Sequence, residues 1–184
     1  RPSRANAADP VNVYDYADAF WSDRLPKAFD DAVEIGELLE TAERDAEQAQ
    51  SPYGRHVGLG GACHFFLRGS ATVTEINRND CTLEIGDGPR RARIRTGVII
   101  GNTVRDGTGL IDVNQFANSQ DFNNLSAELN KRVETDVIAS FRDEVCVGDR
   151  VRFIGCAQVR NDSDFDEILI VPMRLDIEDP EVQP

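Results

Sequence analysis

Residues 98–116 read VIIGNTVRDGTGLIDVNQF, and this run decides the order of elements along the chain. It leaves an apolar, strand-like segment at Val98–Ile100, crosses polar residues and the glycine pair Gly107 and Gly109, and enters a second apolar run. Polar residues and flexible glycines between two buried segments are typical of a binding loop. The sequence therefore predicts that Gly97–Leu129 connects a strand to a helix and carries the candidate site.

Three strands are predicted before this connection. Alternating residues rich in β-branched and aromatic types place them at Cys63–Asn77, Cys81–Gly86 and Ala92–Ile100. Gly69 lets the long first strand bend or bulge.

A helix is predicted after Phe122, because apolar residues recur there at helical spacing. Its apolar face consists of Leu125, Leu129, Val133, Val137, Ile138 and Phe141. Alternation then predicts two more strands, at Arg150–Arg160 and Ile168–Glu178.

Three strands, a helix and two strands is the element order of the OB-fold, a five-stranded Greek-key barrel. We therefore predict an α+β protein: an OB-like five-stranded β-barrel with a helix between strands 3 and 4, preceded by an N-terminal helical segment. An open α+β sheet with the helix on one face is the alternative. In this division residues 1–50 are an acidic helical segment packed on the barrel, residues 51–61 a glycine-rich connection, and residues 62–184 the OB-like domain.

Composition limits the possible partners. The net charge of −13 over 184 residues argues against nucleic acid, because binding polyphosphate depends on Lys and Arg. No run approaches the roughly 18 apolar residues of a membrane-spanning helix. Membrane contact is therefore expected only through a lipid anchor that this sequence does not contain.

The four cysteines contain no CxxC pair, so a metal site is not predicted. Either they are buried free thiols or they form two disulfides. If the first and fourth barrel strands lie antiparallel, Cys63–Cys156 is the preferred bridge and Cys81–Cys146 the second.

Other chemical motifs are incomplete. Asp162, Asp164 and Asp166 have the spacing of calcium-loop ligands, but glycine and glutamate are missing at the later positions, so an ordinary turn is expected. The phosphate-loop pattern is also absent, and no cofactor is predicted. His64 follows Cys63, but neighbours in a strand point to opposite faces, which argues against a thiolate–imidazole pair.

The candidate ligand-binding residues are Asn102, Thr103, Arg105, Asp106 and Asn114. An arginine in a glycine-flanked loop can bind a carboxylate with two hydrogen bonds, and a neighbouring aspartate can accept from hydroxyls. The alternative is that Arg105 and Asp106 form an ion pair that only stabilises the loop.

The run TGVIIGNTVRDGTGLIDVNQFANSQDFNNLSAELNKRV resembles the central signature of a bacterial family of predicted periplasmic lipoproteins, domain of unknown function 2291. YADAFWSDRLPKAF, SPYGRH, HFFLRGSATVTEI and GDRVRFIGCAQV extend the resemblance over nearly the whole chain. The family-like residues are Gly101, Thr103, Arg105, Asp106, Phe116 and the helix from Leu125, whereas the four cysteines are not part of the pattern. The resemblance implies an exported, often lipid-anchored protein, frequently encoded near sugar ABC-transporter components.

These observations together predict a non-enzymatic binding or accessory module in the periplasm or cell envelope. Its expected ligand or partner is a small polar solute or a sugar-transport protein, contacted through Asn102–Asn114. A structural module that docks through the acidic helices is the alternative, and a hydrolase of unknown substrate is the third hypothesis.

Overall fold

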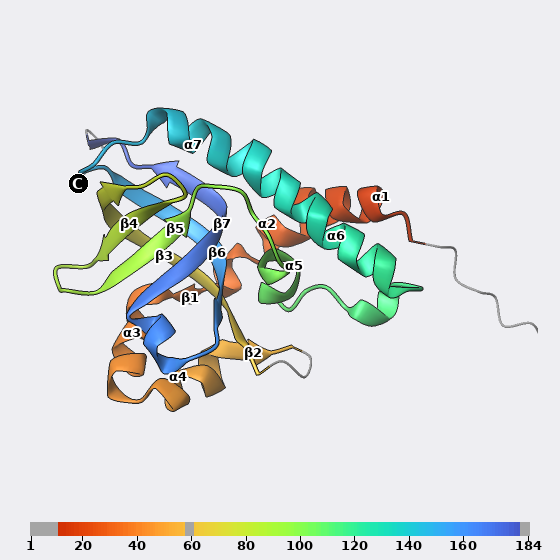
Figure 1. Ribbon diagram of the computed structural model, residues 1–184, viewed down its shortest axis with the longest axis horizontal. Helices are drawn as coiled ribbons and strands as arrows, with labels where there is room; N and C mark the ends of the chain where they lie inside the picture. The colour runs from red at the N-terminus through yellow and green to blue at the C-terminus, as the bar shows by residue number, and fades with distance from the viewer. Residues whose placement is uncertain (1–10, 58–60, 181–184) are drawn as a thin grey trace, which may run out of the picture.

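The computed structural model describes residues 11–57 and 61–180. Its five main strands are β3 (Cys63–Ile76), β4 (Asp80–Ile85), β5 (Arg91–Arg95), β6 (Arg150–Val159) and β7 (Glu167–Ile177). β3 pairs with β4, β4 with β5, β5 with β7 and β7 with β6, and β6 pairs with β3 again (Figure 1). Only the β5–β7 pairing among these is parallel. The α+β class and the antiparallel pairing of the first and fourth predicted strands are confirmed, while the five-stranded barrel stays a prediction.

The third strand is shorter than predicted, because the chain leaves the sheet after Arg95 rather than after Ile100. The N–H groups of Thr96 and Gly97 both donate to the Asn79 carbonyl oxygen, at 2.8 and 3.0 Å. A Cβ on Gly97 would lie 2.7 Å from Asn79 Oδ1 and 3.1 Å from its Cα, so any other residue would force Asn79 to move. The apolar run that follows is therefore not a buried strand.

One long helical run lies along the sheet (Figure 1). It consists of α6 (Ser119–Arg132), the π-helical turn η4 (Val133–Ile138) and α7 (Ala139–Glu144). The predicted apolar face is confirmed, since all six of its residues are buried. The helix starts earlier than Phe122, because the Asn118 side chain accepts from the Asp121 N–H and caps it.

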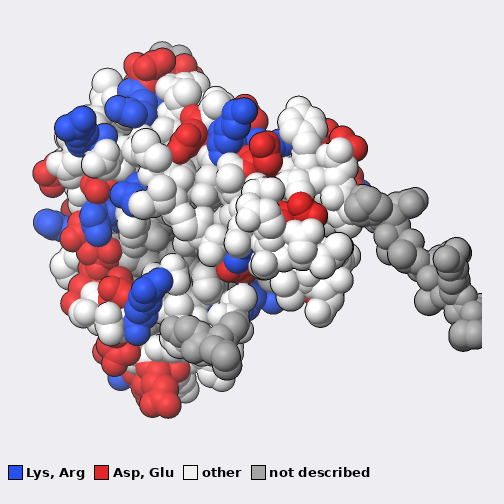
Figure 2. Space-filling view, turned by 45° about the vertical axis from the view of Figure 1, so that its right-hand side comes forward, with Lys and Arg blue, Asp and Glu red and all other residues white. Residues whose placement is uncertain are grey.

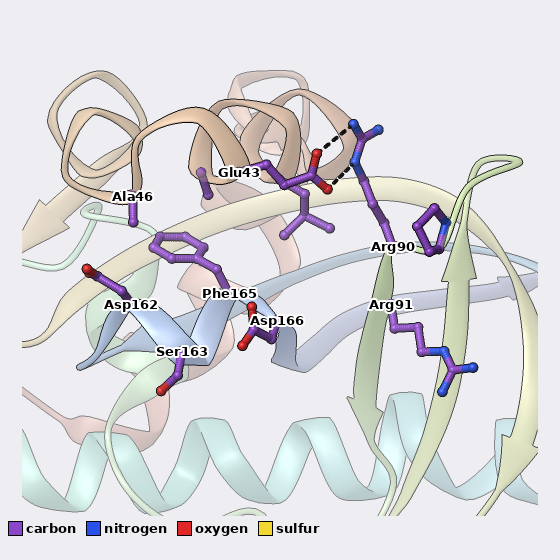
Figure 3. Close-up of a pocket in the computed structure, with 11 residues that line it drawn as sticks. Glu43, Ala46, Arg90, Arg91, Asp162, Ser163, Phe165 and Asp166 are labelled. Atoms are coloured by element: carbon purple, nitrogen blue, oxygen red, sulfur yellow. Dashed lines mark hydrogen bonds and ion pairs between the residues drawn. The ribbon is translucent and has the colours of Figure 1, made fainter.

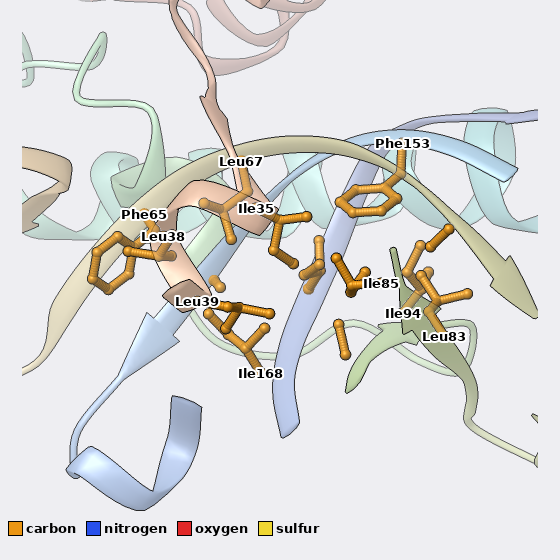
Figure 4. Packing of buried hydrophobic residues seen from close by; sticks show 14 of the residues in the cluster. Ile35, Leu38, Leu39, Phe65, Leu67, Leu83, Ile85, Ile94, Phe153 and Ile168 are labelled. Atoms are coloured by element: carbon orange, nitrogen blue, oxygen red, sulfur yellow. The ribbon is translucent and has the colours of Figure 1, made fainter. Parts of the chain in front are cut away.

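The N-terminal segment is mostly helical, with one short strand. Its elements are α1 (Val13–Ala19), η1 (Phe20–Arg24), α2 (Leu25–Lys27), η2 (Phe29–Asp31), β1 (Val33–Glu34), α3 (Ile35–Arg44) and α4 (Ala46–Tyr53). Ile35, Leu38 and Leu39 of α3 lie in the same apolar cluster as the inner faces of the strands (Figure 4). The helical segment therefore completes this apolar cluster, which we call the main core.

The predicted glycine-rich connection, residues 51–61, begins with ordered elements. Its first residues finish α4, and β2 (Gly54–His56) pairs antiparallel with the start of β3. Residues 58–60 of this connection lie outside the described residues, as do the first ten residues of the helical segment.

The predicted disulfides are wrong, because all four cysteines are free. Cys156 lies opposite Phe66, and Cys63 lies opposite Val159, so the two cysteines are three positions out of register. Successive side chains of a strand alternate between faces, and this offset places Cys63 in the main core and Cys156 in a second cluster beside α6. Cys81 is likewise buried in β4, whereas Cys146 is exposed. The antiparallel pairing was predicted correctly, but the register that would place Cys63 beside Cys156 was wrong by three positions.

We expect one thiol per chain to react rapidly with a thiol reagent in the native state, and four after unfolding in guanidinium chloride. Cys146 is the exposed thiol, whereas burial shields Cys63, Cys81 and Cys156 and raises the pKa of each. Absorbance of the released chromophore counts the thiols. Fewer than four reactive thiols in the unfolded chain would instead support the predicted disulfides.

Candidate functional site

The connection singled out in the sequence folds into a loop, the short helix α5 (Thr103–Gly107), the 3-10 turn η3 (Val113–Gln115) and the start of α6. The helix α5 lies directly against β6, because a Cβ on Gly107 would sit 2.5 Å from the Cβ of Cys156. Gly107, which the sequence suggested was a loop residue, therefore allows α5 to pack closely on β6.

The side chains of Arg105 and Asp106 are 7% and 11% exposed, and they bind each other. Arg105 donates from Nε and Nη2 to the two Asp106 carboxylate oxygens, at 2.8 and 3.0 Å. It also donates from Nη1 to the Phe122 carbonyl oxygen at 3.2 Å, and its guanidinium lies 3.7 Å from the centre of the Phe122 ring. This geometry supports the alternative that the pair ties α5 to the start of α6. A solute would have to displace Asp106 to reach the guanidinium.

A shallow hollow of about 390 Å³ lies between the loop after β5 and α6, and we call it the loop–helix pocket. Its lining residues are Ile99, Ile100, Gly101, Asn102, Asn123, Ser126, Ala127, Asn130, Lys131 and Glu134. Gly101 has a φ of 87°, a conformation that suits glycine. Its carbonyl oxygen accepts from Ser126 Oγ and Asn130 Nδ2, both at 2.9 Å. The loop is thus fastened to one face of the helix.

The loop–helix pocket contains polar groups that the protein itself does not satisfy. Asn130 is 8% exposed, and its Oδ1 has no hydrogen-bond partner among the described residues. Within the described residues, neither the Asn102 side-chain amide nor the Lys131 ammonium makes a hydrogen bond or an ion pair. Glu134 is engaged, because its Oε1 accepts from the Ile99 N–H at 2.7 Å. The Asn102 amide and the Lys131 ammonium are therefore open to a ligand, whereas Asn130 Oδ1 is an unsatisfied acceptor buried behind the pocket wall.

The structure separates the predicted ligand-binding residues. Asn102 lines the loop–helix pocket, and Thr103 follows it as the first residue of α5. Arg105 reaches the rim only by donating to Asn123 Oδ1 at 3.4 Å. Asn114 lies in η3 and is not among the residues that line this pocket.

The residues that sequence reasoning missed come from α6 and from the first turn of η4. Asn123, Ala127, Asn130 and Glu134 recur at helical spacing and form one face of the helix. A polar Asn130 beside the apolar stripe was the signal that could have identified them, because a buried amide needs partners.

A second hollow of about 560 Å³, the α3 pocket, lies between α3, the β4–β5 turn and the 3-10 turn η5 (Asp162–Phe165) (Figure 3). Glu43 and Arg90 neutralise each other across it with hydrogen bonds of 2.8 and 3.1 Å. In Figure 3 the Arg91 guanidinium points away from this pair. Its charged groups therefore do not converge on one ligand position.

The acidic turn beside the α3 pocket has a structural role. Asp164 accepts from the N–H groups of Arg160 and Asn161, at 2.8 and 3.0 Å, and these bonds hold the pKa of its carboxyl below the usual range. Within the described residues, no three His, Cys, Asp or Glu side chains are grouped to hold a metal ion.

The histidine and cysteine at the start of β3 do not form a catalytic pair. The Cys63 side chain lies in the main core, and burial raises the pKa of its thiol. His64 is 4% exposed, and burial lowers its pKa, opposed by the nearby Asp106 carboxylate. A protonated thiol and a neutral imidazole are thus the expected states at neutral pH.

Comparison with known proteins identifies both fold and family. The chain is similar to the crystal structure of an OB-fold protein from Thermotoga maritima, with a TM-score of 0.80 and 22% sequence identity over 91% of this chain and 99% of that one. A likeness at this identity shows the fold alone. No curated protein matches the chain.

No helix in the described part of the chain is long and apolar enough to cross a membrane. The family model described as "Predicted periplasmic lipoprotein (DUF2291)" matches residues 2–176, as the resemblance in the sequence predicts. The chain therefore belongs to this family of predicted periplasmic lipoproteins.

Proposed function

We propose that the protein is a non-enzymatic, extracytoplasmic binding module that holds a small polar solute in the loop–helix pocket. The unpartnered Oδ1 of the buried Asn130 is the observation that carries this proposal. Leaving a buried acceptor unsatisfied costs about 1–3 kcal/mol. A hydroxyl or N–H group of a solute that displaces the side chains covering this buried atom would recover that cost by donating to it.

The chemistry of the pocket favours a ligand with several hydroxyl groups. Oδ1 of Asn130 accepts, the Asn102 amide can both donate and accept, and the Lys131 ammonium donates. This combination suits sugars, and Lys131 would additionally favour a sugar acid. The association with sugar uptake that the family resemblance implies is consistent with this ligand class.

The surroundings of the pocket support an uncharged or weakly charged solute. Of the ten residues that line the pocket, only Lys131 and Glu134 are charged, and their charges are opposite. Figure 2 shows that charged side chains are dense on the left of this face and sparser on its right, where separate acidic and basic groups remain. We also propose that β3, β4, β5, β7 and β6, which pair in this order and close on β3 again, form the five-stranded OB-like barrel. This barrel would give the pocket a rigid support.

A thermal-shift screen of neutral sugars and sugar acids tests the proposal. A ligand at one hundred times its Kd should stabilise the native state by about 2.7 kcal/mol, because it binds only the folded chain. Asn102→Ala and Lys131→Met should reduce the shift. Asn114→Ala is the matched control, since it removes an amide from the same connection outside the pocket and should leave the shift unchanged. No shift for the wild type, or equal losses in all three variants, would contradict the proposal.

Docking through the acidic helices has less support, because several of their carboxylates already serve the fold. Glu43 binds Arg90, Glu37 accepts from the Tyr53 hydroxyl at 2.8 Å, and Glu34 lies 3.8 Å from Arg68. We therefore retain the solute-binding proposal as the conclusion.

A further inference from the structure

His64 is an imidazole buried where the short helix α5 packs on the strands. It lies two positions before Phe66 on β3, so the two side chains share one face of the strand. Phe66 and Cys156 on this face belong to the second cluster beside α6, and α5 joins the same cluster through Val104. Because α5 contacts both β3 and β6, and His64 is only 4% exposed, the imidazole lies at the contact between helix and strands.

The surroundings of His64 fit a neutral imidazole and not an imidazolium. Its Nδ1 is buried, and none of the described residues forms a hydrogen bond with it. A neutral imidazole carries one N–H donor, whereas an imidazolium carries two and needs an acceptor for each. Protonation in this position would therefore bury a charged donor without a partner, which is unfavourable. The pKa of His64 is accordingly lowered, mainly by burial.

The charged groups around His64 come from three elements. After burial, the largest effect on its pKa is that of the Asp106 carboxylate on α5, which raises it. The backbone of Arg55, opposite His64 on β2, also raises the pKa, whereas the Arg105 and Arg160 guanidinium groups lower it. Arg105 already occupies both oxygens of Asp106. An imidazolium would thus add a cation beside a carboxylate that is already bound.

Two further ionisable groups near this contact supply no negative charge. The Cys156 thiol stays protonated, because burial raises its pKa. The Arg55 guanidinium lies against the backbone of Gly109, where a Cβ would be 2.3 Å from its Nη1. Asp106 is therefore the group that a charged His64 would attract.

Attraction of Asp106 by His64 would weaken the tie between α5 and α6. Arg105 links the two helices, since it binds Asp106 and also donates to the Phe122 carbonyl oxygen. An imidazolium competes for one Asp106 oxygen and repels the Arg105 guanidinium. The residue before α5 is Asn102, which lines the loop–helix pocket. A charge on His64 therefore acts on the wall of that pocket.

We propose that His64 is an acid-sensitive latch, whose protonation loosens α5 from β3 and displaces the adjoining wall of the loop–helix pocket. At neutral pH the imidazole is uncharged and α5 stays packed. Because burial lowers the pKa of His64 only in the packed state, that state keeps its full stability above about pH 6.5 and loses it as the pH falls towards the lowered value. The effect on solute binding rests on the proposed solute-binding function, whereas the movement of α5 does not.

Nuclear magnetic resonance of the full chain without ligand, from about pH 8 to about pH 5, tests the latch, since it follows each imidazole separately. The His64 signal should titrate below about pH 6.5, the value of an imidazole in water. Amide hydrogen exchange, corrected for the intrinsic effect of pH, follows α5 in the same samples. Its protection should fall by up to about tenfold between about pH 7.5 and about pH 5.5, the most that one imidazole can contribute.

Two variants identify the imidazole responsible. His64→Gln stays neutral, so the protection of α5 should no longer depend on pH over this range. His56→Gln is the matched control, because it removes the other histidine of the chain, which is exposed on β2, and should keep the pH dependence of the wild type. If His64→Gln does not fold, the wild type decides, since α5 must lose protection at the pH where His64 titrates.

A structural histidine without a latch would give other results. His64 would then titrate at or above about pH 6.5, or α5 would keep its protection while His64 takes up a proton. An equal loss of protection in His64→Gln would assign the effect to carboxylates. Each of these results overturns the latch. If α5 loosens as expected but the affinity for a sugar found by thermal shift does not change with pH, the latch stands and the placement of the solute in the loop–helix pocket fails.

Discussion

Replacing Arg105 with alanine is expected to lower the free energy of unfolding by about 3–5 kcal/mol. The substitution leaves the Asp106 carboxylate, 11% exposed, without its cation. It also removes the hydrogen bond to the Phe122 carbonyl and the contact with the Phe122 ring. Denaturation in guanidinium chloride, followed by far-UV circular dichroism, measures the change.

Arg44→Ala is the matched control for Arg105→Ala. Arg44 is exposed, and its pair with Glu40 spans 4.0 Å, so its loss should change stability by less than about 0.5 kcal/mol. If Arg105→Ala cost no more than this control, the pair would not be structural. Arg105 would then be free to act as the ligand-binding residue that the sequence predicts.

Replacing Leu38 with alanine is expected to cost about 2–5 kcal/mol. Leu38 is fully buried between α3 and the strands, and its loss leaves a cavity in the main core. Alanine is the best helix former, so the change does not weaken α3 itself and measures packing alone. Val113→Ala, at a position 52% exposed, is the control and should change stability by less than about 0.5 kcal/mol.

The way in which the Leu38→Ala variant unfolds is as informative as its stability. Trp21 fluorescence reports on the N-terminal segment, and circular dichroism reports on the whole chain. If α3 belongs to one core with the strands, both signals should change in a single transition. Separate transitions would show that the helical segment is only attached to the strand domain.

The helices and strands were predictable because their signals are local. Alternation and turn residues located β3, β4, β6 and β7, and helical spacing identified the buried face of α6, η4 and α7. The error at β5 has a tertiary cause. The apolar residues after Arg95 read as a continued strand, but the contact of Gly97 with Asn79 turns the chain away.

The candidate site was only partly predictable. Asn102 was identified, since it lies in the connection that the sequence singled out. Asn130 and Lys131 were not, because they come from a helix that folds back on that connection. Sequence reasoning also could not decide between a ligand and Asp106 as the partner of Arg105, since side-chain burial depends on how α5 packs.

The sequence by itself determined the order of strands and helix, the acidic character and the family, because these depend on local composition and pattern. Only the tertiary structure decided the strand register, which separates Cys63 from Cys156, and the burial of the Arg105–Asp106 pair. It also decided where polar groups without partners gather, between the Gly97–Leu129 connection and the part of α6 that follows it. Such groups depend on contacts between residues distant in sequence, so the binding proposal now depends on Asn102, Asn130 and Lys131.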